Sequence, residues 1–180
     1  MLRISGFVPY LTIVFLNAFI DLGHKIVIQN TVFKVYDGET QVVLTAIVNA
    51  LILLPFILLF SPSGFLADKY PKHRVMQFSA LAAVFITLGI TACYYAGWFW
   101  AAFGLTFVLA IQSAFYSPAK YGYIKELVGN KNIAAANGAV QTITIGGILI
   151  GAFVFSALFE HFLTGVKIDS TATVLPPIAT

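Results

Sequence analysis

Residues 64–74 read Gly-Phe-Leu-Ala-Asp-Lys-Tyr-Pro-Lys-His-Arg and separate two long apolar runs, 41–60 and 75–97. Each run is long enough to cross a bilayer, because a transmembrane helix needs about 20 apolar residues. A short polar turn between two such runs predicts a hairpin of two membrane-spanning helices. The turn carries one acid and three permanent cations. We expect it on the cytoplasmic side, because short cationic loops resist translocation.

Composition indicates a membrane protein rather than a soluble one. Hydrophobic residues make up 59% of the 180 residues, charged residues make up 9%, and the mean hydropathy is +0.92. A soluble domain carries about 25% charged residues, so this composition excludes the soluble globular class. The net charge of +3 comes from cations in the predicted loops, which favours a topological role over nucleic-acid binding. Cys93 is the single cysteine, which excludes an intrachain disulfide.

The apolar runs predict an all-α membrane protein with five transmembrane helices. The run at 7–20 could be a signal peptide, but no small-residue cleavage site follows it and apolar sequence resumes at 26–28. Pro55 lies within the second run and is expected to kink its helix, because proline lacks an amide donor. The predicted helices cover about 7–35, 41–61, 75–95, 98–117 and 134–162.

Cations gather on one side of this predicted topology. Two of the ten Lys and Arg residues, Lys34 and Lys167, lie on the other side, and Lys25 lies within the first helix. The positive-inside rule therefore places the amino terminus in the cytoplasm and the tail after the fifth helix outside. Aromatic residues around the turn at 96–97 suit the headgroup layer of the outer face. The seven cations on the cytoplasmic side are Arg3, Lys69, Lys72, Arg74, Lys120, Lys125 and Lys131.

The basic turn itself offers a candidate gate. Gly64 allows close helix packing, because small residues let membrane helices approach one another. Asp68 would lie at the end of the second helix, where it could pair with Lys69 or Arg74 or face the positive amino end of another helix. Such a cluster could hold two halves of a transporter together and open during the cycle; the alternative is a purely topological anchor. The candidate gating residues are Gly64, Asp68, Lys69, Lys72 and Arg74.

The first helix carries polar residues where lipid would disfavour them. Asn17, Asp21 and His24 follow i, i+4, i+7 spacing and share one helical face. A charge at the centre of a membrane helix costs about 2.5–3.5 kcal/mol. We therefore expect this face to line a wet or protein-lined cavity. The alternative is an Asp21–Lys25 pair that neutralises itself and serves only packing.

The fourth helix shows a matching face. Gln112, Tyr116 and Lys120 follow i, i+4, i+8 spacing, and Pro118 denies one backbone carbonyl its usual partner. We expect the helix to break there and to open the backbone near Lys120, so that this face also lines the cavity. The alternative is that Lys120 snorkels to the membrane interface.

The fifth helix begins with Asn137 and Gln141 on one face, and these residues are weaker cavity candidates. Gly147 and Gly151 follow with the spacing of a small-xxx-small surface. We expect this surface to pack closely against another helix.

Two groups of residues carry a resemblance to a known family. The glycine, acid and cations of 64–74 resemble the loop between helices two and three of the major facilitator superfamily. Within that superfamily, 115–122 (Phe-Tyr-Ser-Pro-Ala-Lys-Tyr-Gly) resembles the lysophospholipid transporter family. Further matches lie at 126–127, 136–138 and 19–21, so that the resemblance covers most of 15–152.

The resemblance implies an amino-terminal helical bundle with inverted three-helix repeats, in which the first and fourth helices line the cavity. Residues 1–163 would form this bundle without its sixth helix, and 164–180 would be a polar extracytoplasmic tail or linker. Asp21 and Lys120 would then suit a zwitterionic headgroup. The implied function is movement of lysophospholipids between the leaflets of a bacterial inner membrane for reacylation. The implied partners are lysophospholipid, membrane lipids, a carboxy-terminal transporter half missing from this sequence, and an acyltransferase that is separate or fused downstream.

Two other functions stay open at the level of sequence. The chain could belong to a facilitator of another solute, such as a drug or a sugar, or it could be a membrane module that anchors a fused acyltransferase. An enzyme is not expected within the chain, because no nucleophile–base constellation, HExxH or CxxC motif occurs. No catalytic residue, metal site, cofactor or nucleic-acid partner is therefore predicted.

Overall fold

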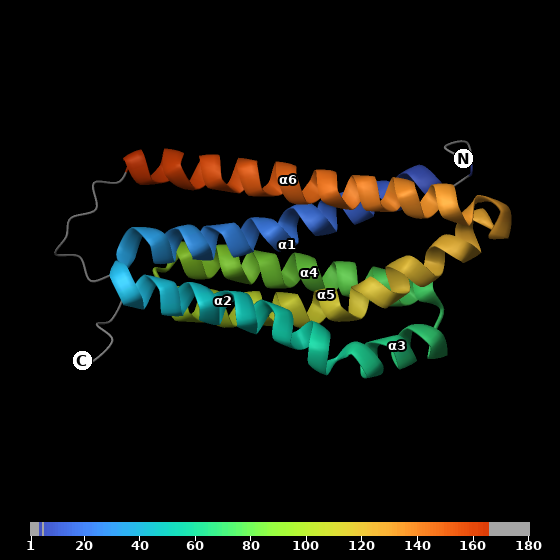
Figure 1. Cartoon of the computed structure of the whole chain (residues 1–180), viewed down its shortest axis with the longest axis horizontal. Coiled ribbons are helices and arrows are strands. Elements are labelled where there is room, and N and C mark those ends of the chain that lie inside the picture. Colours follow the sequence, from blue (N-terminus) through green and yellow to red (C-terminus); the bar gives the residue numbers. More distant parts are fainter. Residues whose placement is uncertain (1–3, 5, 166–180) are drawn as a thin grey trace.

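The computed structural model describes residue 4 and residues 6–165, with side chains as far as His161. Within this part the chain is helical and contains no strand, which confirms the predicted all-α fold. The helices lie side by side along one long axis (Figure 1). They are α1 (Phe7–Val35), α2 (Gly38–Leu58), α3 (Phe60–Lys69), α4 (Lys72–Tyr95), α5 (Phe99–Val128) and α6 (Ile133–Gly165), with a short 3-10 helix η1 (Asn130–Asn132) before α6.

Five segments of the described chain are long and apolar enough to cross a membrane. They overlap the five predicted helices, and the bounds of the first, 7–35, are those of α1. Tyr95 and Trp98 lie exposed at the turn between α4 and α5, as expected for a headgroup layer. The chain therefore forms a multi-pass membrane bundle.

The polar stretch 64–74 is mostly helical, although its polarity predicted a loop. After an interruption at Leu59, α2 continues as α3, which ends at Lys69, and α4 begins at Lys72. Only Tyr70 and Pro71 form the turn. The residue before a proline is forced out of the helical region, so the helix ends where Pro71 requires it and not where the charges begin. The interruption at Leu59 lies one turn after Pro55, which is itself within α2.

The helix α5 also extends beyond its predicted end at residue 117. It continues without a break through Pro118 to Val128, so the expected opening of the backbone near Lys120 is not observed. A proline removes one intrahelical hydrogen bond. Membrane helices tolerate this loss because neighbouring helices can satisfy the freed backbone group. The helix ends at Gly129, whose φ of +70° is a conformation that glycine adopts without strain.

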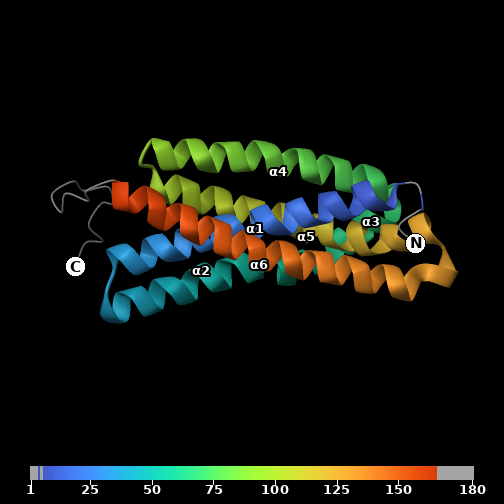
Figure 2. The same ribbon diagram turned by 90° about the horizontal axis from the view of Figure 1, so that it is seen from above.

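Two helix pairs form the bundle, and α1 lies along α6 while α4 lies along α5 (Figures 1 and 2). The segments α2 and α3 pack mainly against α5. The end that holds the Tyr70–Pro71 turn and η1 is called the basic end. Five cations lie at or near it: Lys69, Lys72, Arg74, Lys125 and Lys131.

The seam between α1 and α6 is built on glycine, as the small-residue spacing predicted. A Cβ at residue 147 would lie 2.8 Å from the carbonyl oxygen of Phe15, and a Cβ at residue 151 would lie 2.6 Å from that of Phe19. These distances leave no room for a side chain, so the two backbones touch. Further along the seam, Lys34 Nζ lies 3.0 Å from Oε1 of Glu160.

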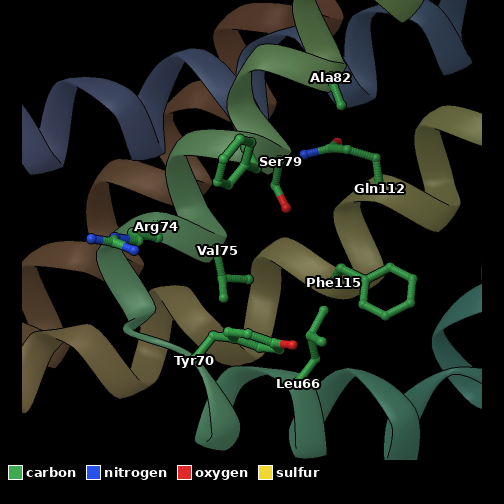
Figure 3. Close-up of a pocket in the computed structure, with 9 residues that line it drawn as sticks. Leu66, Tyr70, Arg74, Val75, Ser79, Ala82, Gln112 and Phe115 are labelled. Carbon is green, nitrogen blue, oxygen red and sulfur yellow. The ribbon is translucent and has the colours of Figure 1, made fainter.

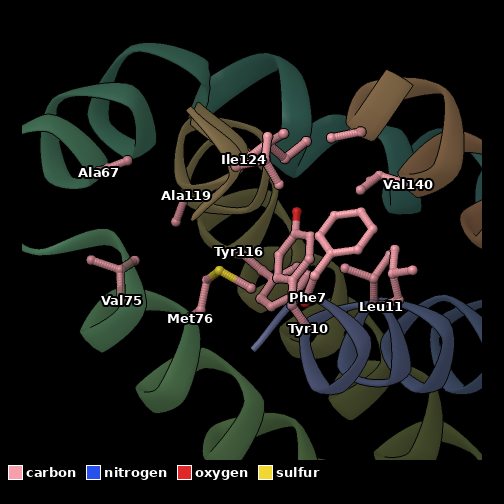
Figure 4. Close-up of a cluster of buried hydrophobic side chains, with 13 residues drawn as sticks. Phe7, Tyr10, Leu11, Ala67, Val75, Met76, Tyr116, Ala119, Ile124 and Val140 are labelled. Carbon is pink, nitrogen blue, oxygen red and sulfur yellow. The ribbon is translucent and has the colours of Figure 1, made fainter. Parts of the chain in front are cut away.

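A cluster of buried apolar side chains holds the basic end together (Figure 4). Phe7 and Tyr10 of α1 contribute to it, and the Tyr10 ring stacks edge-on against Tyr123 with centroids 5.7 Å apart. Tyr116 of α5 and Met76 of α4 lie in the same cluster. Apolar contacts from α1, α3, α4, α5 and α6 therefore meet at this end of the bundle.

Arg3 and the tail from residue 166, including Lys167, lie outside the described residues. The division into a bundle at 1–163 and a tail at 164–180 stays a prediction, although α6 continues to Gly165.

We predict that Gly151→Ala destabilises the bundle by about 1–3 kcal/mol, because the added Cβ forces the α1 and α6 backbones apart. The matched control is Gly146→Ala in the same helix, where a Cβ would meet nothing within 4 Å. Thermal unfolding of the purified protein in detergent measures the effect. Equal Tm values for the two variants would show that the α1–α6 contact is looser than described.

Candidate functional site

Asp21 is the acid of the first helix, and it faces α5 across the bundle. The Ser113 hydroxyl of α5 lies within hydrogen-bonding reach of its carboxylate, and Lys25 and Lys120 interact with it electrostatically. The ion pairs among the described residues are Lys34–Glu160 and Lys72–Glu126, so neither lysine forms a direct ion pair with Asp21. An acid of α1 and a cation of α5 thus share one protein interior without neutralising each other by contact.

Lys120 is held inside the bundle and does not snorkel. The residue is 8% exposed, and its Nζ lies 4.5 Å from the centroid of the Tyr121 ring, in a cation–π contact. Its backbone carbonyl accepts a hydrogen bond of 2.8 Å from the Tyr10 hydroxyl of α1. A lysine that merely marked the interface would carry its ammonium into water. Lys120 instead contacts Tyr10 through its backbone carbonyl and the Tyr121 ring through its ammonium group.

The predicted face of α5 divides between two surroundings. Tyr116 is 2% exposed within the apolar cluster of the basic end, and its hydroxyl has no partner there. Gln112 lines a groove toward α3 and α4, and Asp21 is not among the residues that line it (Figure 3). Residues at i, i+4 and i+8 drift by about 40° per step on a helix of 3.6 residues per turn, so Gln112 and Lys120 point about 80° apart.

Ser113 links these two surroundings. Its hydroxyl carries one proton and lies within reach of two acceptors, the Asp21 carboxylate and Oε1 of Gln112 at 3.3 Å. Only one of the two can receive that proton at a time. Gln112 therefore receives this hydrogen bond only when the Ser113 hydroxyl does not donate to Asp21.

The other candidates of α1 and α6 differ in their exposure and in their contacts. Asn17 is half-buried on the same face of α1, whereas His24 is 6% exposed and packs against Phe155 of α6, with ring centroids 5.7 Å apart. Gln141 accepts a hydrogen bond of 3.1 Å from the Tyr121 hydroxyl, whose ring lies beneath Lys120. Asn137 is exposed, and no described side chain contacts it by hydrogen bond.

At the basic end, one of the candidate gating residues joins two helices. Lys72 Nζ lies 3.0 Å from Oε1 of Glu126, which connects α4 to α5. The lysine stem crosses Gly122, where a Cβ would lie 2.7 Å from Cε of Lys72. Glycine at this position is therefore what allows the ion pair to form over the helix surface.

The remaining gating candidates have few contacts within the described residues. Asp68 and Arg74 are exposed and form no ion pair there, so the expected Asp68 pairing with Lys69 or Arg74 is not observed. Lys69 lies 5.7 Å from the ring centroids of Phe65 and Tyr70. A Cβ at Gly64 would meet nothing within 4 Å. The gating role of this group stays a prediction.

Sequence reasoning missed three residues of the site, although spacing could have indicated two of them. Ser113 precedes Lys120 by seven residues, and Tyr10 precedes Asp21 by eleven. Such intervals are close to two and three helical turns and keep residues on one face. Glu126 carried no comparable signal, because its pairing with Lys72 depends on how α4 and α5 meet.

No group of His, Cys, Asp and Glu in the described part of the chain has the arrangement of a metal site. The polar residues that are gathered between α1 and α5 are an acid, a lysine, a serine and tyrosines. This set can hold a molecule that carries both charges by hydrogen bonds and electrostatic attraction.

Comparison with known proteins shows which family the sequence matches. Residues 4–166 match the family model described as Major Facilitator Superfamily. The chain is also similar to the lysophospholipid transporter LplT of Enterobacter sp. (36% identity over 117 residues, 62% of this chain and 27% of that protein). Similar values hold for LplT of Photorhabdus laumondii (36% over 112 residues, 60% and 26%) and of Escherichia coli (35% over 115 residues, 61% and 26%). The matched segments span about a quarter of these relatives. No solved structure matches the chain.

We predict that Gly122→Ala and Lys72→Met are non-additive in their effect on stability. The Cβ at residue 122 displaces the lysine stem, so either change alone removes the Lys72–Glu126 pair, which is worth about 0.2–1 kcal/mol at an exposed site. Thermal unfolding of the two single variants and the double variant gives the coupling. Gly104→Ala in the same helix is the control, because a Cβ there meets nothing within 4 Å. Fully additive losses would mean that the lysine does not cross Gly122.

Proposed function

The chain belongs to the Major Facilitator Superfamily, and from this membership we propose that it is the amino-terminal part of a transporter of lysophospholipids. The complete transporter moves these lipids between the leaflets of a bacterial inner membrane, where they are reacylated. The names of the similar proteins support this substrate class. The acyltransferase that would use the lipid is a separate protein or a later part of the same chain.

The observation that carries the proposal is the pair formed by Asp21 of α1 and Lys120 of α5. Lys120 is buried and Asp21 is partly buried, and the two interact without a direct ion pair. A zwitterionic headgroup carries a phosphate and an ammonium on one short chain. The phosphate would bind Lys120 and the ammonium would bind Asp21, so that each interior charge would be matched by the substrate.

Alternating access would bring the second half of the transporter against this face. Transporters of this kind hold the substrate near the bilayer midplane between two halves that rock against each other. Asp68, which forms no ion pair within the described residues, would contact the carboxy-terminal half and act as the gate. Asn17, His24, Tyr116, Asn137 and Gln141 would contribute weaker contacts to the cavity.

The basic end would face the cytoplasm. Its cations are held at short turns, which is the arrangement that resists translocation. Phe7, at the start of α1, lies at the same end as the Tyr70–Pro71 turn, so the amino terminus would then also be cytoplasmic (Figure 1).

We predict that Lys120→Glu in the complete transporter reduces lysophospholipid movement at least about tenfold, because a hydrogen bond to a charged group contributes about 1.5–3 kcal/mol. Lys131→Glu is the matched control, since it changes the charge of the basic end equally but lies exposed beyond α5. The measurement is flipping of a labelled lysophosphatidylethanolamine in proteoliposomes, with soluble sugars and drugs as competitors. Equal, mild losses in both variants would remove Lys120 from the substrate site. Competition by a soluble solute would instead favour a facilitator of that solute.

The proposed orientation predicts labelling from opposite sides. In a Cys93→Ser background, Thr40→Cys lies near the turn between α1 and α2, and His73→Cys lies at the basic end. A membrane-impermeant maleimide added outside intact cells should label residue 40 alone, and residue 73 should react only after the membrane is opened. Labelling of both from one side would overturn the assignment of α2 and α3 as a single span.

A further inference from the structure

A groove lies between α3, α4 and α5, on a side of the bundle to which α1 and α6 do not contribute (Figure 3). Its volume is about 670 Å³, which is within the range of about 300–1,000 Å³ that is typical of ligand pockets. Most of its lining is apolar, with Leu66 of α3, Val75 of α4 and Phe115 of α5 among the walls. Neither Asp21 nor Lys120 lines the groove.

The groove opens beside an exposed apolar face of α4. Phe78, which lines the groove, is 72% exposed, and Phe85 further along the same helix is 67% exposed. No helix in the described part of the chain covers this apolar face. In a membrane bundle such a face contacts acyl chains. A molecule that enters the groove therefore comes from the bilayer.

The deep part of the groove contains a hydrogen-bond donor without a partner. Gln112 is 6% exposed, and its Nε2 makes no hydrogen bond, while its Oε1 accepts from Ser113 at 3.3 Å. The amide nitrogen points toward Ser79 across the groove (Figure 3). Ser79 is 9% exposed and lines the same groove. Buried donors of this kind are costly unless an acceptor reaches them, and hydrocarbon supplies none.

The rim of the groove carries a positive charge. Arg74 is exposed and forms no ion pair within the described residues, and Tyr70 lies beside it at the turn. Arg74 precedes Ser79 by five residues, which is about 7.5 Å along a helix. The groove thus offers a cation at the headgroup level, hydrogen-bond donors about 7.5 Å deeper, and apolar walls. A diacyl phospholipid has the same order of phosphate, ester carbonyls and acyl chains.

We propose that the groove binds one anionic diacyl phospholipid from the leaflet at the basic end. Its phosphate binds Arg74, an ester carbonyl accepts a hydrogen bond from Nε2 of Gln112, and an acyl chain lies against Phe78 and Phe115. This lipid is a resident ligand and not the transported molecule. The inference does not depend on which solute the protein moves.

The test is retention of dioleoyl phosphatidylglycerol by the purified transporter, titrated in detergent and counted by native mass spectrometry. Arg74→Gln should weaken binding about tenfold, because it removes a hydrogen bond between two charged groups. Gln112→Leu should weaken it about threefold to tenfold, because the lost bond is neutral on one side. Lys125→Gln is the matched control, since this cation is exposed at the same end but does not line the groove.

Lys120→Glu should leave the affinity for phosphatidylglycerol unchanged, which separates this groove from the proposed transport site. If Gln112→Leu does not fold, Arg74→Gln at the exposed rim still decides the matter. Equal affinities of Arg74→Gln and Lys125→Gln would overturn the proposal, since binding would then reflect only the general positive charge of the basic end. Equal retention of dioleoylglycerol, which lacks the phosphate, would overturn it as well.

Discussion

The membrane interior supplies no water, and every polar group of this chain must therefore find its partner within the protein or reach the bilayer surface. Helices satisfy their own backbone, which explains why the described chain is helical almost throughout. The Lys34–Glu160 and Lys72–Glu126 pairs lie toward opposite ends of the bundle, near the polar layers. Lys120 is buried and Asp21 is partly buried far from these layers, and two charges are costly there unless the space between α1 and α5 is used.

This constraint also explains which parts of the fold could be predicted from the sequence. Hydropathy located all five spans, because lipid selects for apolar residues regardless of how helices meet. It located helix ends less well at α3 and α5, since polar residues continue a helix once it reaches the headgroup layer. The end of α3 is fixed by Pro71, and the end of α5 is fixed by Gly129. A proline or glycine was therefore a better marker of these ends than a charge.

The site shows a similar division. A charge inside an apolar run is visible in the sequence, which is how Asp21 and Lys120 were predicted to line one cavity. Their surroundings were not visible, because Tyr10 and Ser113 are common residue types that gain meaning only when α1 and α5 meet. Spacing alone placed Gln112 with Lys120, whereas the helical drift between them turns Gln112 toward α3 and α4. Residues that share a periodic pattern can therefore still face different neighbouring helices.

The α1–α6 seam has a consequence for the order of synthesis. The glycines that receive Phe15 and Phe19 lie 132 residues later in the chain. At about 5–20 residues per second, α6 emerges from the ribosome roughly 7–26 s after the matching part of α1. During that interval α1 has no α6 backbone to rest against, although it already carries Asp21 and Lys25. The first span made is thus among the last to be fully packed, because its contact with the glycines of α6 forms only when α6 arrives.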